Sequence, residues 1–135
     1  MPREITSHKV NGLNESLKIL AMDEPGSSGV NHVYHVFADE SVTTLGDGVT
    51  VSTMIQFQNG PIGSTNEEYG VVGVNGISGE ALLAIVEDRL KSFQFGPYLC
   101  RENALALTHL QEAIHWLHHR TRERMQRGVE GTHQK

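Results

Sequence analysis

The amino-acid sequence predicts an α+β fold in which an antiparallel, β-rich region precedes a C-terminal αα-hairpin. Up to residue 77, apolar side chains tend to alternate, and Gly, Asn or Pro interrupts them at short intervals, as in strands joined by turns. From residue 78 they recur every three or four positions instead, as in amphipathic helices. Neither half carries an apolar pattern sufficient for a complete core. We therefore expect one functional domain that self-association completes.

Three apolar runs are the expected strands of residues 1–77. The first alternates at Leu17, Ile19 and Ala21, and the others cover residues 30–37 and 49–57. Turn-forming residues separate them at 25–29, 46–48, 59–61 and 75–76. Asp47-Gly48 is the best hairpin candidate, because glycine supplies the positive φ that a tight turn requires. Residues 63–70 are polar and aperiodic, which predicts a surface loop.

Two helices are expected over residues 78–127. Ser78 is the predicted N-cap of the first, Glu80 lies in its first turn, and Gly96-Pro97 ends it. The second runs from about Arg101 to Arg127, and its interior contains no helix-breaking residue. One stripe of it carries Leu107, Leu110, Ile114 and Leu117. A flexible tail is expected over residues 128–135.

The charge distribution excludes some partners. The net charge is -5, with 11 Lys and Arg against 16 Asp and Glu, which argues against generic binding to DNA, RNA or an anionic membrane. The balance nevertheless changes sign along the chain: residues 1–98 sum to -7 (5 basic, 12 acidic), and residues 99–135 sum to +2 (6 basic, 4 acidic). A single cysteine and a polar N-terminus favour the cytosol, and we expect no membrane span.

Residues 93–103 combine the groups that a nucleotide site needs. Aromatic rings of Phe93 and Tyr98 can stack on a base, Arg101 can pair with a phosphate, and Asn103 can hydrogen-bond a base edge or a ribose hydroxyl. The N-terminus of the second helix favours an anion. The alternative is structural: Phe93 and Phe95 close the hairpin core while Arg101 and Asn103 cap the helix.

Four arginines between residues 120 and 127 form a second candidate. Arg120 and Arg124 are four residues apart and therefore share a helix face, where they can grip two phosphates. The alternative is a solvated basic helix end, which the helix dipole favours.

The sequence shows no clear catalytic or metal site, and we assign no metal and no cofactor. His115, His118 and His119, with Glu112, have spacings that can converge on zinc, but no further ligand stands at a recognisable spacing. Solvated or stacked histidines explain them more simply. Cys100 has no histidine beside it in sequence and is interpreted as a packed small residue.

Several motifs together resemble a known family. These are FQNGPI at residues 57–62, GVNG at 73–76, EALLAIVEDRL at 80–90 and CRENALAL at 100–107, followed by Trp116-Leu117, Arg120-Thr121, Arg124 and RGVEGT at 127–132. The combination resembles the helical hairpin domain of phage-encoded anti-Thoeris and anti-CBASS sponges. The β-rich region ahead of the hairpin resembles the anti-Thoeris branch.

The resemblance implies a non-enzymatic viral protein of the infected host's cytoplasm. It implies binding and sequestration, without cleavage, of glycocyclic ADP-ribose isomers made by TIR-domain enzymes, with Phe93, Arg101 and Asn103 in the pocket. Tyr98 and Asn59 lie in the matching motifs and are expected as further contacts. Arg120 and Arg124 match a second site for cyclic di- or trinucleotides. The family is oligomeric, with dimers forming the first pocket and a hexamer the second.

The sequence differs from the family pattern at two places, and two other functions remain as alternatives. The link at residues 63–70 is longer than usual, and His118-His119 stands where polar residues or lysine are more frequent. One alternative is a metal-dependent cyclic-nucleotide hydrolase that uses His115 and His119. The other is a module that only oligomerises. The sequence does not distinguish the isomers of the ligand and assigns no contact to residues 1–50.

Overall fold

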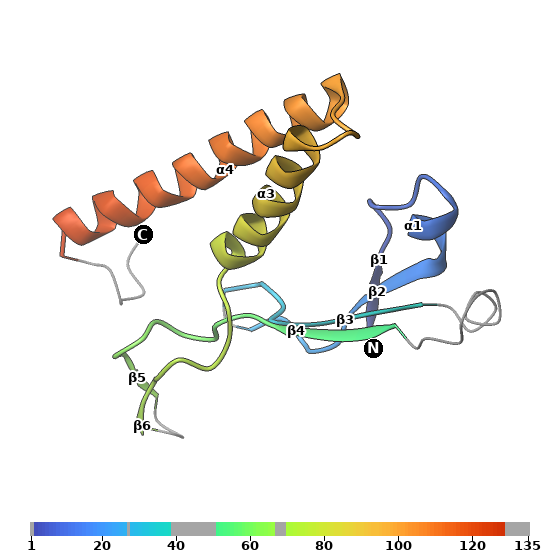
Figure 1. Ribbon diagram of the computed structural model, residues 1–135. Coiled ribbons are helices and arrows are strands. Elements are labelled where there is room, and N and C mark those ends of the chain that lie inside the picture. Colours follow the sequence, from blue (N-terminus) through green and yellow to red (C-terminus); the bar gives the residue numbers. More distant parts are fainter. Residues whose placement is uncertain (1, 27, 39–50, 67–69, 129–135) are drawn as a thin grey trace. The chain divides into compact units, whose positions relative to one another are not determined.

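The computed structural model describes residues 2–26, 28–38, 51–66 and 70–128. The chain divides into two compact units, Met1–Asn59 and Gly60–Lys135. The first contains a four-stranded sheet, and the second contains a short β-ribbon and two long helices (Figure 1). This architecture confirms the predicted α+β class, with antiparallel strands ahead of C-terminal helices.

The sheet of the first unit is antiparallel throughout. Its strands β1 (Arg3–Ile5), β2 (Leu17–Ala21), β3 (Val33–Ala38) and β4 (Ser52–Gln56) lie in the order β1-β2-β3-β4. The last three coincide with the runs predicted from sequence, although β3 extends one residue beyond its run, which ended at residue 37. Strand β1 and the short helix α1 (Gly12–Ser16) lie where the sequence showed no recognisable motif. Asn11 begins α1, and its side chain accepts a hydrogen bond from the Asn14 N–H at 2.9 Å.

The register collects apolar side chains on one face of the sheet. Ala21 pairs with Tyr34, which pairs with Ile55, so alternate positions of three strands share this face. The Tyr34 ring meets Phe57 edge to face, with centroids 5.7 Å apart. Ala21 is 1% exposed and is the only apolar residue among those described that is fully buried.

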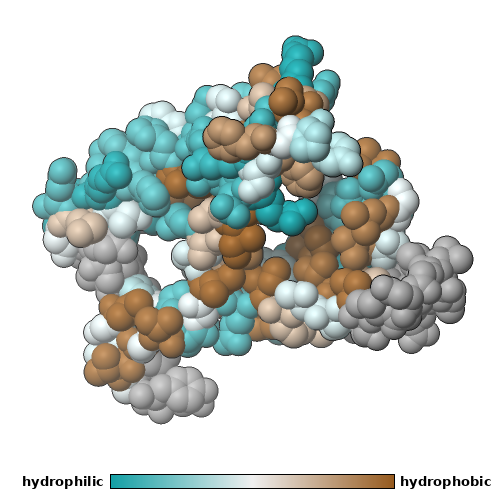
Figure 2. All heavy atoms as spheres, viewed as in Figure 1, coloured by the Kyte–Doolittle hydropathy of each residue, from teal (hydrophilic) through white to brown (hydrophobic). Residues whose placement is uncertain are grey.

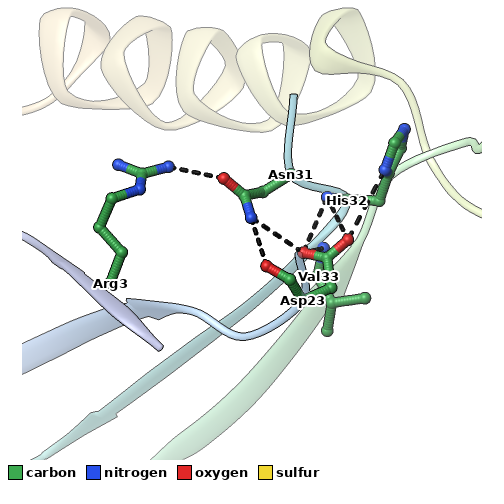
Figure 3. Close-up of polar contacts among 5 residues, drawn as sticks. All are labelled: Arg3, Asp23, Asn31, His32 and Val33. Carbon is green, nitrogen blue, oxygen red and sulfur yellow. Dashed lines mark hydrogen bonds and ion pairs between the residues drawn. The ribbon is translucent and has the colours of Figure 1, made fainter. Parts of the chain in front are cut away.

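The connection between β2 and β3 is held by one carboxylate (Figure 3). Asp23 accepts hydrogen bonds from the backbone N–H groups of His32 (3.0 Å) and Val33 (3.1 Å). The Asn31 amide donates to Asp23, and its oxygen accepts from Arg3 on β1 at 2.7 Å. A turn closes within the predicted region 25–29, where the Gly29 N–H donates to Gly26 at 2.9 Å with a Gly29 φ of +84°.

Part of the loop predicted at residues 63–70 is strand instead, and residues 67–69 lie outside the described residues. Strand β5 (Thr65–Asn66) pairs with β6 (Gly70–Val71), and the N–H of Val72 extends this ribbon by donating to Ser64 at 2.8 Å. Apolar alternation identifies a strand that is buried on one side. Val71 of this ribbon is 72% exposed, so the segment had no apolar alternation from which a strand could be predicted. The predicted Asp47-Gly48 hairpin and the predicted tail beyond Gly128 lie outside the described residues.

The hairpin consists of α3 (Gly79–Phe95) and α4 (Arg101–Gln126). The Ser78 hydroxyl accepts from the Ala81 N–H at 3.1 Å, and Gly96 ends α3, as predicted. From Leu83 on α3 and from Asn103 on α4, half-buried positions recur mostly every three or four residues, which is the pattern of helices packed along a seam. The half-buried residues are Gly79, Glu80, Leu82, Leu83, Glu87, Leu90 and Gln94 on α3 and Asn103, Ala104, Leu107, Leu110, Ile114 and Thr121 on α4, where Arg124 is fully buried.

The two helices bury little against each other. Of the 17 residues of α3, all of them described, none is fully buried, and of the 26 residues of α4 only Arg124 is. Figure 2 shows apolar side chains at the surface over both the hairpin and the β5–β6 ribbon. Exposed apolar residues of α3 include Ile85 (59%), Val86 (46%) and Phe95 (91%). Among the described residues, no helix is both long and apolar enough to cross a membrane.

Candidate functional site

The first candidate residue, Phe93, lies on the exposed side of α3, in the last turn of the helix. Its side chain is partly open, at 40% exposure, because the packed seam of α3 passes through Leu90 and Gln94 instead. Arg89 lies one turn earlier on the same face, and its guanidinium carbon stands 5.7 Å from the centroid of the Phe93 ring. This distance is typical of a cation–π contact. The ring is therefore available for stacking and has a cation beside it.

A pocket of about 360 Å³ adjoins this pair and is lined by Asp88, Arg89, Ser92 and Phe93. The volume lies at the small end of the range for ligand pockets in proteins, roughly 300–1,000 Å³. The Ser92 hydroxyl donates to the backbone carbonyl of Asp88 at 3.1 Å, so its oxygen remains an acceptor. The lining thus combines an aromatic face with a cation and hydrogen-bond acceptors.

Two side chains fix the connection between Phe93 and the start of α4. The Gln94 amide oxygen accepts a hydrogen bond from the Cys100 N–H at 3.1 Å. Cys100 is the N-cap of α4, and its sulfur accepts from the Asn103 N–H at 3.4 Å. The thiol therefore performs the capping role that a serine or aspartate usually has. The interpretation of Cys100 as only a packed small residue missed this role.

The predicted ligands at the start of α4 follow this cap. Arg101 is the first residue of the helix and is exposed, and Asn103 is half-buried in the first turn. Tyr98 lies in the connection and is 75% exposed. The Gln94–Cys100 hydrogen bond thus ties the helix end that carries Phe93 to the helix start that carries Arg101 and Asn103. An anion at this place would also be favoured by the positive end of the 26-residue helix.

Asn59 is the last residue of the first unit, whereas the other predicted residues belong to the second. Its side chain is exposed, and it takes part in an interaction within the structure. It follows Phe57, whose backbone N–H donates to the His32 carbonyl at 2.7 Å and so anchors this end of the segment to the sheet.

The two arginines of the second predicted site, Arg120 and Arg124, differ in burial. Arg120 is exposed, but Arg124 is 6% exposed and takes part in an interaction within the structure. The reason lies in the seam of α4, which continues from Ile114 through Thr121 to Arg124 and leaves Arg120 beside it. Nineteen residues separate Arg120 from Arg101, so the two lie about 29 Å apart along the helix axis. The two candidate groups are separate places on one hairpin.

The histidine-rich part of α4 forms a stacked aromatic group. The rings of His115 and His119 are 6.4 Å apart at an interplanar angle of 19°, and Trp116 meets both edge to face. His119 also lies 3.3 Å from a carboxylate oxygen of Glu123. Within residues 2–26, 28–38, 51–66 and 70–128, no group of three or more His, Cys, Asp or Glu is arranged to hold a metal ion.

A model of a protein family, described as the Acb2/Tad1 hairpin domain, matches residues 50–122. The match covers more than half of the 135 residues. The chain belongs to the Acb2/Tad1 hairpin-domain family. The match includes both helices up to Arg122 and the predicted residues Asn59, Phe93, Tyr98, Arg101, Asn103 and Arg120. Arg124 lies two residues beyond it.

A relative of this Acb2/Tad1 hairpin-domain chain is "Thoeris anti-defense 1" of Bacillus phage SBSphiJ7. It is 51% identical over 79 residues, which are 56% of this chain and 56% of that protein. The alignment thus spans little more than half of the phage protein's length. The resemblance seen in the sequence is confirmed at the level of the family.

Two residues of the site were missed by sequence reasoning. Arg89 precedes Phe93 by four residues on a predicted helix, and this spacing was a signal from which the contact could have been predicted. Gln94 had no such signal, because its partner is the backbone N–H of Cys100 across the turn. That contact depends on the conformation of the connection, which the residue types do not specify.

Proposed function

We propose that this chain is a phage anti-defence protein that binds glycocyclic ADP-ribose isomers and keeps them from their receptor. Membership of the Acb2/Tad1 hairpin family and 51% identity to a Thoeris anti-defence protein support the functional class. The observation that carries the proposal is the end of the hairpin, where one hydrogen bond ties the Phe93 turn of α3 to the Arg101 and Asn103 turn of α4.

Each residue of this group has a chemical role toward such a ligand. Phe93 offers a partly exposed ring face to a purine, and the Arg101 guanidinium faces the pyrophosphate with paired N–H donors. The Asn103 amide donates to and accepts from the base or a ribose hydroxyl. Tyr98 and Asn59 supply further contacts.

The proposed activity is binding without cleavage, so the protein is not an enzyme. A signal held at a dissociation constant of 1 nM is bound by about -12 kcal/mol, which removes it from its receptor without any chemical step. Such affinity toward a small ligand requires several charge-assisted contacts in a preformed pocket. The protein works in the cytoplasm of the infected bacterium, where TIR-domain enzymes make the signal, and it requires no cofactor.

A homo-oligomer completes the sites in this proposal. Support comes from the exposed apolar side chains of α3, where Ile85 and Val86 lie outside the packed seam. Burying a side chain of this size stabilises a protein by roughly 1.5–3 kcal/mol, so a second copy is a suitable cover for this face. A dimer would form the pocket for ADP-ribose isomers, and a hexamer would bring hairpins together around a second ligand.

The second ligand class consists of cyclic di- and trinucleotides. Its support is Arg120, which is exposed and lies about 29 Å from Arg101 along α4, too far for both arginines to contact the same small ligand in one copy. Arg124 is buried and engaged within the structure, so it joins this site only if its side chain becomes exposed to the ligand.

The decisive experiment separates binding from turnover. The purified protein is incubated with a glycocyclic ADP-ribose, freed of unbound ligand by gel filtration and denatured by heat. Mass spectrometry of the released fraction should then show the intact ligand. Recovery of only linear or hydrolysed product would support an enzyme instead, and chelator sensitivity would then test a metal at His115 and His119.

Variants test the residues. Arg101→Ala should weaken binding by roughly tenfold or more, because a charge-assisted hydrogen bond contributes about 1.5–3 kcal/mol. Asn103→Ala should weaken it by about fivefold, because a neutral hydrogen bond contributes about 1 kcal/mol. Arg122→Ala is the matched control, since it removes the same charge from an exposed position on α4. Native mass spectrometry gives assembly size and ligand count together. Unchanged binding in both variants would support the alternative that the protein is a module that only oligomerises.

A further inference from the structure

Arg89 is the one cation placed against the aromatic ring of the proposed site by a contact within the described residues. Its guanidinium carbon lies 5.7 Å from the Phe93 centroid. In the part of the chain that the structure describes, no carboxylate pairs with this guanidinium, although Asp88 is its neighbour in sequence. Its five N–H donors are therefore not committed to a protein partner there.

Lys91 provides a contrast on the same helix. It pairs with Glu87 one turn earlier, at 3.9 Å, and lies away from the pocket lining. A cation of α3 that serves only the helix is thus matched by a carboxylate at the i,i+4 position. Arg89 instead has Ile85 at the position one turn earlier and Phe93 one turn later, so no carboxylate stands at its i,i+4 positions.

A guanidinium in this position has two properties that suit one class of ligand. It is planar and covers one face of an aromatic ring, which holds the ring and leaves its other face for a base. Its N–H groups point outward from its edge, where they can donate in pairs to a phosphate. A ligand that uses both must carry a phosphate close to its stacked base.

We propose that Arg89 is a specificity-determining residue of the Phe93 pocket and selects nucleotides whose phosphate is held beside the base. The inference rests on the proposed function and names a feature of its ligand. Ring closure in a cyclic nucleotide limits where its phosphates can lie relative to the base, whereas a linear nucleotide must lose conformational freedom to hold them there. The pocket of about 360 Å³ accommodates one nucleoside-sized portion of such a ligand.

The acceptors of the lining support the same ligand class. The Ser92 hydroxyl oxygen keeps lone pairs free, because its hydrogen is used by the Asp88 carbonyl. The Asp88 carboxylate can accept from an exocyclic amine or a ribose hydroxyl. An anion alone would be repelled by Asp88, so the pocket favours a ligand with both a donor edge and a phosphate over free phosphate.

The test compares four full-length proteins: wild type, Arg89→Met, Arg89→Lys and the control Lys91→Met. Methionine keeps an unbranched stem and removes the charge, so folding should be retained, as circular dichroism and melting temperature would verify. Calorimetry would measure the dissociation constant for a glycocyclic ADP-ribose at low and high salt. Linear ADP-ribose would serve as the second probe.

Arg89→Met should weaken binding of the cyclic ligand by roughly tenfold or more and flatten its salt dependence, because one phosphate contact is lost. The preference for cyclic over linear ligand should fall as well. Arg89→Lys should restore part of the affinity through its charge, and Lys91→Met should stay within about twofold of wild type. A merely structural role would not change the salt dependence.

The possible failures are distinguishable. If wild type binds the cyclic ligand and Arg89→Met behaves like Lys91→Met, the role of Arg89 is wrong and the proposed function stands. If wild type binds neither probe, the proposed function is wrong and the inference falls with it. If Arg89→Met loses affinity but keeps the salt slope and the ligand preference of wild type, Arg89 only supports the ring.

Discussion

Gln94 and Cys100 are joined across the turn of the hairpin, with the amide oxygen of Gln94 accepting the Cys100 N–H at 3.1 Å. Both residues are partly buried, so the contact is shielded from water on one side. It connects the last turn of α3 to the N-cap of α4, and the proposed ligand residues lie on both sides of it. The stability of the hairpin and the affinity for ligand should therefore depend on the same bond.

Gln94→Ala should lower the free energy of unfolding by about 1 kcal/mol, because the Cys100 N–H loses its acceptor while partly buried. Urea denaturation of the purified protein would measure the change. Gln94→Glu keeps an acceptor of the same length and is the matched control, with a smaller loss. Equal losses in both variants would show that the amide has a role other than accepting this bond.

Cys100 offers a second test of the same turn. Its backbone is extended (φ -154°, ψ 162°) and its sulfur accepts from the Asn103 N–H at 3.4 Å, so it meets the geometric requirement of an N-cap. Cys100→Ser should preserve or raise stability, since a hydroxyl is a stronger acceptor than a thiol. Cys100→Ala should cost about 1 kcal/mol. Thermal melts under reducing conditions would compare them, and Ala equal to Ser would rule out capping by the side chain.

The fold was predictable where apolar residues recur with the period of a strand or of a helix. Strand β2 has apolar residues at alternate positions from Leu17 to Ala21, and helix α4 has an apolar stripe through Leu107 and Ile114, so the two periodicities identified them. In the ribbon of β5 and β6, Thr65, Gly70 and Val71 are exposed, and this segment gave no such signal. Local spacing cannot reveal contacts that a turn creates, which is why the Gln94–Cys100 bond required the structure.

The candidate site divides in the same way. Phe93, Arg101 and Asn103 were proposed from residue types near a helix–helix turn. The structure adds the two hydrogen bonds, Cys100 N–H to Gln94 and Asn103 N–H to Cys100, that connect the two helices there. The shared face of Arg120 and Arg124 was inferred from their spacing of four residues. Spacing does not report burial, and the seam of α4 includes Arg124 but not Arg120.

The hydrogen bonds that Asp23 accepts from His32 and Val33, here called the Asp23 clamp, predict that the sheet unit loses stability at acidic pH. Burial raises the pKa of Asp23, but hydrogen bonds from Val33, His32, its own backbone and Asn31 outweigh it, so the pKa is lowered from 3.8. An unfolded chain therefore takes up the proton at higher pH than the folded one. The stabilisation is present above the unfolded pKa and is lost as the pH falls through the folded value.

Asp23→Asn tests this linkage. The variant should melt at a lower temperature than wild type at pH 7, because an amide nitrogen replaces one acceptor opposite the His32 and Val33 N–H groups. Its melting temperature should also fall less than that of wild type between about pH 5 and pH 3, where the carboxylate is protonated. Glu15→Gln removes a charge from an exposed position of the same unit and is the control. Parallel pH curves for wild type and Asp23→Asn would contradict the role of the clamp.

Arg120 and Arg124 should separate stability from binding at the second proposed site. Arg124 is 6% exposed and engaged within the structure, so Arg124→Ala should cost roughly 2 kcal/mol or more, because it removes a buried side chain together with its interaction. Arg120→Ala should change stability by no more than about 0.5 kcal/mol, because its side chain is exposed. Urea denaturation without ligand would measure both. If cyclic trinucleotide binding is then lost in Arg120→Ala at unchanged stability, the loss reports a phosphate contact; equal stability losses in both variants would contradict the burial difference that the seam of α4 creates.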